Sequence, residues 1–158
     1  LNRSRLAGDA LPGALFDCDA ELPGLLATLN MIHGEHLTLS ARAPEGLQLP
    51  WDREDLLELL GNLLDNACKW ADAEVRLTVS ETEKSYLLAV EDDGPGIPEA
   101  QRDRVFSRGA RLDEQTDGHG LGLGIVRDIV EVWGGVLQLQ ESELGGLKVL
   151  IELPRRRS

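Results

Sequence analysis

Residues 62–70 read NLLDNACKW and lie in a leucine-rich segment, residues 52–71, whose apolar positions recur with the spacing of an amphipathic helix. Asp52 stands where an aspartate commonly caps a helix N-terminus. At about 100° per residue, the predicted helix has two opposed faces. The apolar face holds Leu57, Leu60, Leu64, Ala67 and Ala71, and the polar face holds Glu58, Asn62, Asp65, Asn66 and Lys69.

The polar face has two interpretations. A charged stripe on a helix is usually a solvated face. Two asparagines four residues apart are less usual there, because Asn costs a helix up to roughly 0.7 kcal/mol relative to Ala. Amide oxygens are hard ligands that suit Mg²⁺, and Lys69 could meet a phosphate as a point charge. The face is therefore either solvated or part of a metal and phosphate site.

Periodicity outside this helix predicts an alternation of helices and strands. The expected elements are a helix at 21–33, strands at 36–43, 73–81 and 85–93, a helix at 123–133, and strands at 136–142 and 147–153. Residues 94–120 contain seven glycines and prolines and predict a long loop with at most one short helical turn, near 101–106. Such loops are often lids. The order of elements predicts an α+β two-layer sandwich, with helices on one face of a mixed sheet.

Composition limits the function classes. The chain has 16 Lys and Arg against 28 Asp and Glu, a net charge of −12, which argues against nucleic acid or an anionic membrane as the main partner. Cys18 and Cys68 form no disulfide framework or zinc motif. No stretch is apolar enough to span a bilayer, and the first residues do not resemble a signal peptide.

Two further motifs contain chemically useful groups. VEDDGPGIP, residues 90–98, is either a strand running into a turn or a carboxylate beside a flat ligand, with glycines that let the backbone approach. GHGLGLGIV, residues 118–126, leads into a helix whose free N–H groups could bind phosphate. It differs from a dinucleotide-binding fingerprint because no strand precedes it.

Taken in order, NLLDNACKW, DDGPGIP, RVFSRGAR, GHGLGLGIV and LGGLKVLIEL resemble the N, G1, F, G2 and G3 boxes of sensor histidine kinases. These kinases belong to the GHKL superfamily, with type II topoisomerases, Hsp90 and MutL. The N and G1 boxes look especially like those of PhoQ-type kinases. The resemblance implies a Bergerat ATP-binding fold over residues 21–153, with a mobile ATP lid. Residues 1–20 would then be a remnant of the junction to a dimerisation domain, and residues 154–158 a tail.

The resemblance also implies the roles of individual residues. By match to the N box, Asn66 would bind Mg²⁺, Asn62 would support phosphates or metal waters, Lys69 would contact phosphate and Trp70 would lie beside the nucleotide. By match to G1, Asp92 would accept a hydrogen bond from the adenine amino group. The remaining expected nucleotide-binding residues are Gly94, Gly96, Ile97, Phe106, Arg108, Arg111, Gly118, His119, Gly120, Leu121, Gly122 and Leu123.

Some of these assignments have alternatives. By match to the F box, Phe106 would seat the lid. The resemblance to PhoQ-type lids favours Arg111 over Arg108 as the phosphate contact, although either could be an ordinary surface arginine. His119 fits a loop residue beside the phosphates better than a metal ligand or a base. Hydrolytic GHKL members carry a glutamate where this chain has Asn62, and an amide cannot act as a base, so fast ATP hydrolysis is not expected.

The implied function is transfer of the γ-phosphoryl group of Mg·ATP to a histidine on a separate dimerisation domain. His33, His36 and His119 do not fit that phosphoacceptor, so the acceptor lies outside this sequence. The expected partners are this dimerisation domain and a response regulator, and the expected location is the cytoplasmic side of an inner-membrane sensor, without direct membrane contact by this domain. A non-catalytic nucleotide-binding module and a GHKL ATPase remain as alternatives.

Overall fold

The computed structural model describes residues 15–34, 36–96 and 117–154. The helices in this part of the chain are α2 (Cys18–His33), α3 (Arg53–Trp70) and α4 (Asp117–Val132). The strands are β1 (Leu15–Asp17), β2 (Thr38–Arg42), β3 (Gln48–Asp52), β4 (Glu74–Glu81), β5 (Ser85–Asp92), β6 (Val136–Glu141) and β7 (Leu147–Pro154). The predicted positions of the main helices and strands are therefore confirmed.

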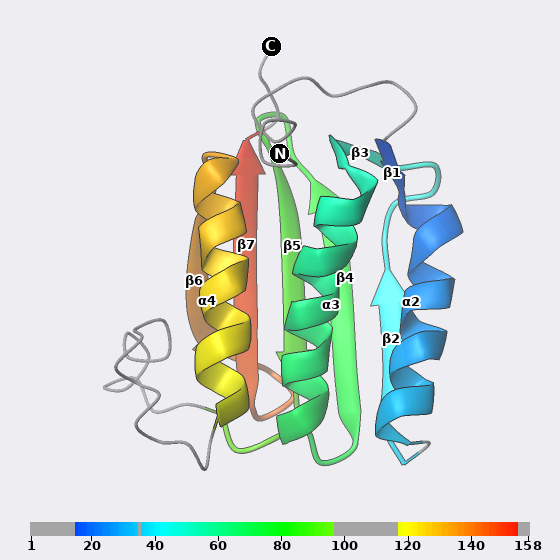
Figure 1. The fold of residues 1–158 in the computed structure, drawn as a ribbon, viewed down its shortest axis with the longest axis vertical. Helices are drawn as coiled ribbons and strands as arrows, with labels where there is room; N and C mark the ends of the chain where they lie inside the picture. The colour runs from blue at the N-terminus through cyan, green and yellow to red at the C-terminus, as the bar shows by residue number, and fades with distance from the viewer. Residues whose placement is uncertain (1–14, 35, 97–116, 155–158) are drawn as a thin grey trace.

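The main sheet has five strands in the order β2-β4-β5-β7-β6. Only β2 and β4 are parallel, and the other neighbouring pairs are antiparallel, so the sheet is mixed as predicted. A second, two-stranded sheet joins β1 to β3. The three helices lie side by side on one face of the main sheet (Figure 1), which confirms the α+β two-layer architecture.

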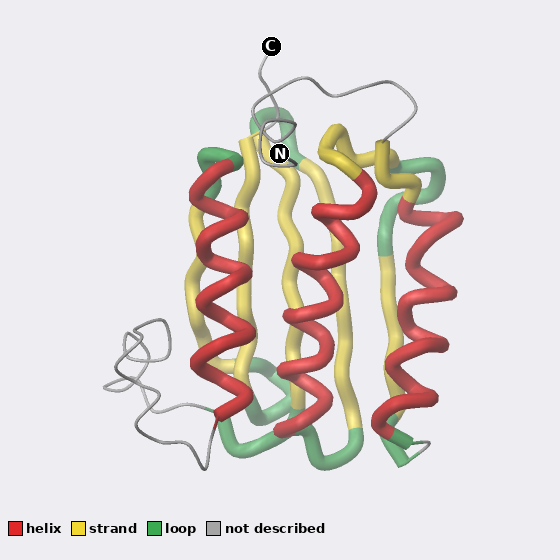
Figure 2. The backbone as a smooth tube through the Cα atoms, viewed as in Figure 1, coloured by secondary structure: helices red, strands yellow, loops and turns green. Residues whose placement is uncertain are grey.

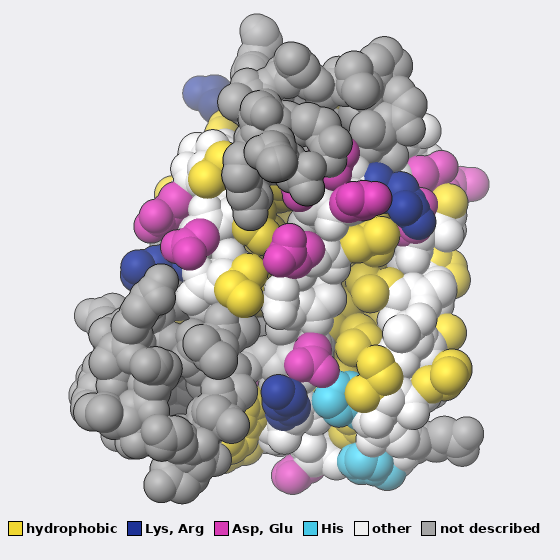
Figure 3. All heavy atoms as spheres, in the orientation of Figure 1, with side chains coloured by type: hydrophobic (Ala, Val, Ile, Leu, Met, Phe, Trp, Pro, Cys, Tyr) yellow, Lys and Arg dark blue, Asp and Glu magenta, His cyan; other side chains and the backbone are white. Residues whose placement is uncertain are grey.

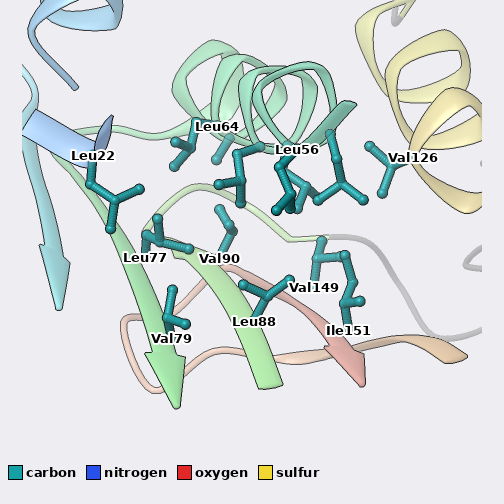
Figure 4. Close-up of a cluster of buried hydrophobic side chains, with 14 of the residues drawn as sticks. Leu22, Leu56, Leu64, Leu77, Val79, Leu88, Val90, Val126, Val149 and Ile151 are labelled. Carbon is teal, nitrogen blue, oxygen red and sulfur yellow. The ribbon is translucent and has the colours of Figure 1, made fainter. Parts of the chain in front are cut away.

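Helix α3 occupies the centre of this layer, and its sequence explains where it begins and which side it buries. Asp52 caps its N-terminus by accepting from the N–H groups of Glu54 and Asp55 at 3.1 and 3.2 Å, as predicted. Leucines fill the buried side of the helix, and Leu56 and Leu64 are both 0% exposed. They point toward β-sheet residues such as Leu88 (Figure 4). Burial of this apolar face is the main force that holds the helix on the sheet.

The buried side of α3 differs from the predicted apolar face. Leu56, Leu59 and Leu63 belong to the core, whereas Leu57 and Ala71 are only partly buried. The reason is that α3 packs against α4 on one flank and α2 on the other, as well as on the sheet. A centrally placed helix buries a wider arc than the stripe expected for a helix with one partner.

The structure contains two short strands that periodicity missed. In β3, Pro50 argues against a strand, but β3 pairs only with β1, and proline is tolerated in such edge positions. β1 has three residues, too few for an alternating pattern. Its Phe16 pairs with Leu49, and both side chains are 0% exposed. The packed core therefore extends upstream of residue 21.

Two helix starts also differ from expectation. Helix α2 begins at Cys18 because the Asp17 carboxylate accepts from the N–H groups of Asp19 and Ala20. Helix α4 begins at Asp117, so Gly118, Gly120 and Gly122 are helical where a loop was expected. Packing of Leu123, which is 0% exposed, and the buried residues after it stabilises this glycine-rich start. Of the predicted loop, 94–120, residues 97–116 lie outside the described residues.

The ends of the remaining elements agree with the sequence patterns. Gly134, with φ of +77°, follows α4 in the conformation that glycine favours after a helix. Pro154 is the last residue of β7, so the described strand reaches the first residue of the expected tail. Among the described residues, no helix is long and apolar enough to cross a membrane.

Candidate functional site

Three chain segments that carry the predicted motifs meet at one end of the molecule. The C-terminus of α3, the end of β5 and the N-terminus of α4 all lie at the lower end in Figure 1, and the loops that join them are drawn in green or grey in Figure 2. Helices α3 and α4 are packed against each other above the sheet. The fold therefore brings the N, G1 and G2 motifs together from positions far apart in the sequence.

Asn66 is the residue of α3 that a solvated face does not explain. It is 4% exposed, and its buried Oδ1 has no hydrogen-bond partner among the described residues. An unpaired buried acceptor costs about 1–3 kcal/mol, so such an atom calls for an explanation. A side-chain amide oxygen is a hard, neutral ligand that suits Mg²⁺. The side chain thus fits the metal that the N box implies.

Asn62 lies one turn before Asn66, and its side chain turns back onto its own helix. Its Nδ2 donates to the Glu58 carbonyl oxygen at 2.8 Å. The amide oxygen remains the only acceptor that this side chain can offer to a ligand. The amide has no basic group that could take a proton from water, which agrees with the expectation of slow hydrolysis.

Lys69 is held by a neighbouring carboxylate that the sequence did not single out. Its Nζ lies 3.6 Å from Asp65 Oδ2, and the other oxygen of Asp65 lies 2.7 Å from His33 Nε2. A histidine, an acidic and a basic side chain adjoin over the lower end of α3 in Figure 3. The i, i+4 spacing in the sequence predicts the Asp65–Lys69 pair within α3. His33 reaches Asp65 because α2 packs against α3.

Asp92 ends β5 and is 4% exposed. Its Oδ1 accepts from the Gly94 N–H at 2.9 Å and more weakly from the Leu147 N–H at 3.4 Å. Among the described residues, Oδ2 receives no such bond. Burial raises the pKa of Asp92 even though these two backbone hydrogen bonds lower it. The carboxylate is therefore fixed in place with one oxygen available to a hydrogen-bond donor.

Gly146, the last residue of the β6–β7 turn, supports Asp92. The Gly146 N–H donates to the Asp92 carbonyl oxygen at 3.1 Å, and a Cβ at Gly146 would lie 2.3 Å from Asp92 Oδ1. The sequence contained Gly145 and Gly146 as a turn signal, and Gly145 has φ of +109°. The role of Gly146 beside Asp92 depends on the register of β5 with β7, which the sequence alone did not give.

Gly94 joins the end of β5 to the end of α3. A Cβ at Gly94 would lie 2.1 Å from the Trp70 carbonyl oxygen, so no other residue fits without movement of the backbone. Gly96 has φ of +74°, a conformation that other residues rarely adopt. The two glycines let the G1 segment pass directly under the C-terminus of α3, beside Trp70.

Asp93 is a second functional candidate that sequence reasoning left without a role. Its carboxylate accepts from the N–H groups of Asp72, Ala73 and Glu74, which follow the C-terminus of α3. The sequence showed an acidic pair but not which member faces which partner. Alternation along a strand places the two side chains on opposite sides, so Asp92 and Asp93 serve different segments.

The other predicted residues are less fully described. Gly118, His119, Gly120, Leu121 and Gly122 lie in the first turns of α4, where backbone N–H groups could meet an anion. The Leu123 side chain belongs to the core, so only its backbone could contact a nucleotide. The predictions for Ile97, Phe106, Arg108 and Arg111 lie outside the described residues.

Comparison with known proteins agrees with this geometry. The sequence profile of the family described as histidine kinase-, DNA gyrase B-, and HSP90-like ATPase matches residues 51–157. Sensor protein kinase CarS of Pseudomonas aeruginosa strain PAO1 is 65% identical over 158 residues, which is 100% of this chain and 36% of CarS. Sensor protein PhoQ of Escherichia coli K12 is 36% identical over 140 residues, 87% of this chain and 28% of PhoQ.

Solved structures show the same fold. A mycobacterial sensor histidine kinase, MprB, aligns with a TM-score of 0.72 and 27% sequence identity, over 91% of this chain and 98% of that one. The ATP-binding domain of PrrB from Mycobacterium tuberculosis aligns with a TM-score of 0.73 and 24% identity, over 90% of this chain and 97% of that one. The chain spans roughly a third of the length of the curated relatives that it matches.

Proposed function

Because this chain belongs to the family of histidine kinase-, DNA gyrase B- and HSP90-like ATPases, as the ATP-binding domain of a sensor histidine kinase, we propose that it phosphorylates a histidine. The donor is Mg·ATP, and the acceptor lies on a separate dimerisation domain. The observation that carries the proposal is the buried, unpartnered Oδ1 of Asn66 on the same end of the fold as the fixed carboxylate of Asp92.

Asp92 gives the site its preference for adenine. Its Oδ2 accepts from an exocyclic amino group, which adenine has and guanine lacks at the corresponding position. Guanine would present a carbonyl oxygen instead and leave the buried carboxylate facing another acceptor. Loss of a hydrogen bond to a charged group costs on the order of 2–4 kcal/mol, so ATP is preferred over GTP.

The phosphates lie between α3 and the start of α4. Lys69 supplies a positive charge from α3, and the N–H groups in the first turn of α4 supply donors and the positive end of the helix dipole. Asn66 would hold Mg²⁺ through its Oδ1, and Asn62 would support the phosphates or the metal's waters. The metal, when bound, neutralises charge on the phosphate oxygens.

The chain positions ATP for an external nucleophile. Phosphoryl transfer depends mainly on alignment and charge neutralisation, and the protein need not form a covalent intermediate. A nitrogen of the acceptor histidine forms a bond to the γ-phosphorus while the bond to the β–γ bridging oxygen breaks, and ADP leaves. Asn62 provides no base for water, so ATP persists until the acceptor arrives.

The proposal includes partners and a location that follow from the relatives. The acceptor domain is the kinase's own dimerisation domain, and a response regulator receives the phosphoryl group next. We place this domain on the cytoplasmic side of a membrane-anchored sensor, as an inference from the sensor proteins to which it is similar.

The experiment supplies the missing acceptor. The chain is mixed with a separately prepared dimerisation domain and γ-labelled ATP, and phosphohistidine is measured on the acceptor. Label on the acceptor, abolished when its histidine is replaced, is the expected result. Tight ATP binding without transfer would favour a nucleotide-binding module, and rapid release of inorganic phosphate without an acceptor would favour an ATPase.

A further inference from the structure

Asp93 connects the end of β5 to the segment that follows α3. Its Oδ1 accepts from the N–H groups of Asp72 at 2.8 Å, Ala73 at 3.0 Å and Glu74 at 3.1 Å. Its Oδ2 accepts from the Ala73 N–H at 3.2 Å. One carboxylate therefore binds three consecutive backbone donors, an arrangement that favours a negative charge.

These bonds hold a segment that the sheet only partly restrains. The last pair of the β4–β5 ladder is Val75 with Asp92, so residues 71–73 lie beyond the ladder. Helix α3 ends at Trp70, and Ala71 caps it in an extended conformation. The Ala73 carbonyl oxygen accepts from the Thr38 N–H at 2.7 Å, but that bond leads to β2 and not to β5. Asp93 makes the side-chain connection between this segment and β5.

The two ends that Asp93 joins carry the two halves of the nucleotide site. Asp92, the adenine carboxylate, is the adjacent residue on β5, and Lys69 and Trp70 are the last two residues of α3. Gly94 fits against the Trp70 carbonyl oxygen with no space for a side chain. A shift of the α3 end relative to β5 would therefore change the distance between the adenine and phosphate contacts.

We propose that Asp93 is a positioning residue, which sets the spacing between Asp92 and the α3 residues Lys69 and Trp70 and thereby the affinity for ATP. This inference rests on the proposed nucleotide-binding function. The charge state of Asp93 supports it. Desolvation acts to raise the pKa of Asp93, but the hydrogen bonds from Ala73, Glu74 and Asp72 outweigh it and hold the pKa below its ordinary value. The carboxylate is therefore ionised at neutral pH.

The chain offers a matched control at the opposite end of the same helix. Asp52 also accepts from two backbone N–H groups, those of Glu54 and Asp55, but it lies at the N-terminus of α3, away from the site. Asp93→Ala and Asp52→Ala therefore remove the same kind of contact from the two ends of α3. If Asp93 has a purely structural role, Asp93→Ala and Asp52→Ala should change ATP affinity to a similar extent.

The experiment measures the affinity of wild type, Asp93→Ala, Asp93→Asn and Asp52→Ala for a non-hydrolysable Mg·ATP analogue by calorimetry. Asp93→Ala should weaken binding by at least about tenfold, equivalent to about 1.4 kcal/mol, because the end of α3 can then shift relative to β5. Asp93→Asn keeps one acceptor oxygen, so its affinity should lie between those of Asp93→Ala and wild type. Asp52→Ala should bind normally despite a lower melting temperature. Hydrogen exchange at residues 72–74 should rise in the Asp93 variants alone.

The outcomes separate the inference from the proposed function. If Asp93→Ala binds the ATP analogue as tightly as wild type, the positioning role is overturned and the proposed function is left intact. If Asp93→Ala does not fold, Asp93→Asn serves for the same comparison. An equal loss of affinity in Asp52→Ala would overturn it too, because the effect would then follow general stability. A wild-type chain that binds no nucleotide would overturn both.

Discussion

Gly146 and Asp92 are in direct contact at the end of β5: the Gly146 N–H donates to the Asp92 carbonyl oxygen at 3.1 Å, and a Cβ at Gly146 would lie 2.3 Å from Asp92 Oδ1. The position of the buried carboxylate thus depends on the absence of a side chain at Gly146, in the turn between β6 and β7. The β6–β7 turn therefore belongs to the proposed adenine site, to which Gly146 contributes its backbone.

We expect Gly146→Ala to displace Asp92 and weaken ATP binding by at least tenfold, equivalent to about 1.4 kcal/mol. The added methyl group has no space, because its nearest neighbours include the Asp92 backbone and the Gly94 nitrogen. Titration with ATP measures the effect. Gly24→Ala in α2 is the control, since a Cβ there meets nothing within 4 Å, and it should raise helix stability by about 1 kcal/mol. Unchanged affinity in Gly146→Ala would contradict the contact.

Asp92 and Asp93 should respond to pH with opposite signs. The pKa of Asp92 is raised by burial, so the folded state holds its proton more tightly than the unfolded state. Its contribution to stability is present below the ordinary aspartate pKa and is lost as pH rises through the raised value. The pKa of Asp93 is lowered, so its contribution is present above the ordinary pKa and is lost as pH falls through the lowered value.

Urea unfolding of the two amide variants between acidic and neutral pH measures this difference. Asp92→Asn should raise the free energy of unfolding at neutral pH, and Asp93→Asn should lower it, with both differences shrinking at acidic pH. Asp92→Asn should also lose the preference for ATP over GTP. A less stable Asp92→Asn at neutral pH, or retained discrimination against GTP, would contradict the assignment of the buried carboxylate.

Asn66→Ala should abolish most Mg²⁺-dependent ATP binding without loss of fold stability. The variant removes a buried oxygen that has no hydrogen-bond partner, and leaving such a group unpaired costs about 1–3 kcal/mol, which offsets the lost packing. ATP titrations with and without Mg²⁺, beside thermal unfolding, test both parts. Asn66→Asp should also bind Mg·ATP poorly. Near-normal affinity in either variant would remove the metal assignment.

The positive charge of Lys69 should strengthen ATP binding, and the negative charge of Asp65 beside it should weaken ATP binding. Lys69→Gln should weaken ATP binding a few-fold, and Asp65→Asn should strengthen it by a similar factor, because the two groups lie 3.6 Å apart and are partly exposed. Both effects should shrink as salt concentration rises. Glu131→Gln on α4 changes the net charge as Asp65→Asn does, so it separates a local effect from a global one. Equal effects of these two variants would argue against the local interaction.

The order of the main elements and the family could both be predicted from local sequence patterns. Helix α3 could be predicted because its apolar spacing and its Asp52 cap are local properties. The strands β4, β5, β6 and β7 could be predicted because alternation is also local. The N, G1 and G2 motifs identified a nucleotide site because each requires particular residue types at fixed spacings.

Which of these residues touch one another depends on the packing of segments that are distant in the sequence. Strand register places Gly146 against Asp92, helix packing brings His33 to Asp65, and the end of β5 lies where Asp93 reaches the segment after α3. The short β1 and β3 and the early start of α4 were missed for the same reason. Their stability comes from partners distant in the sequence, and local propensity carries no information about such partners.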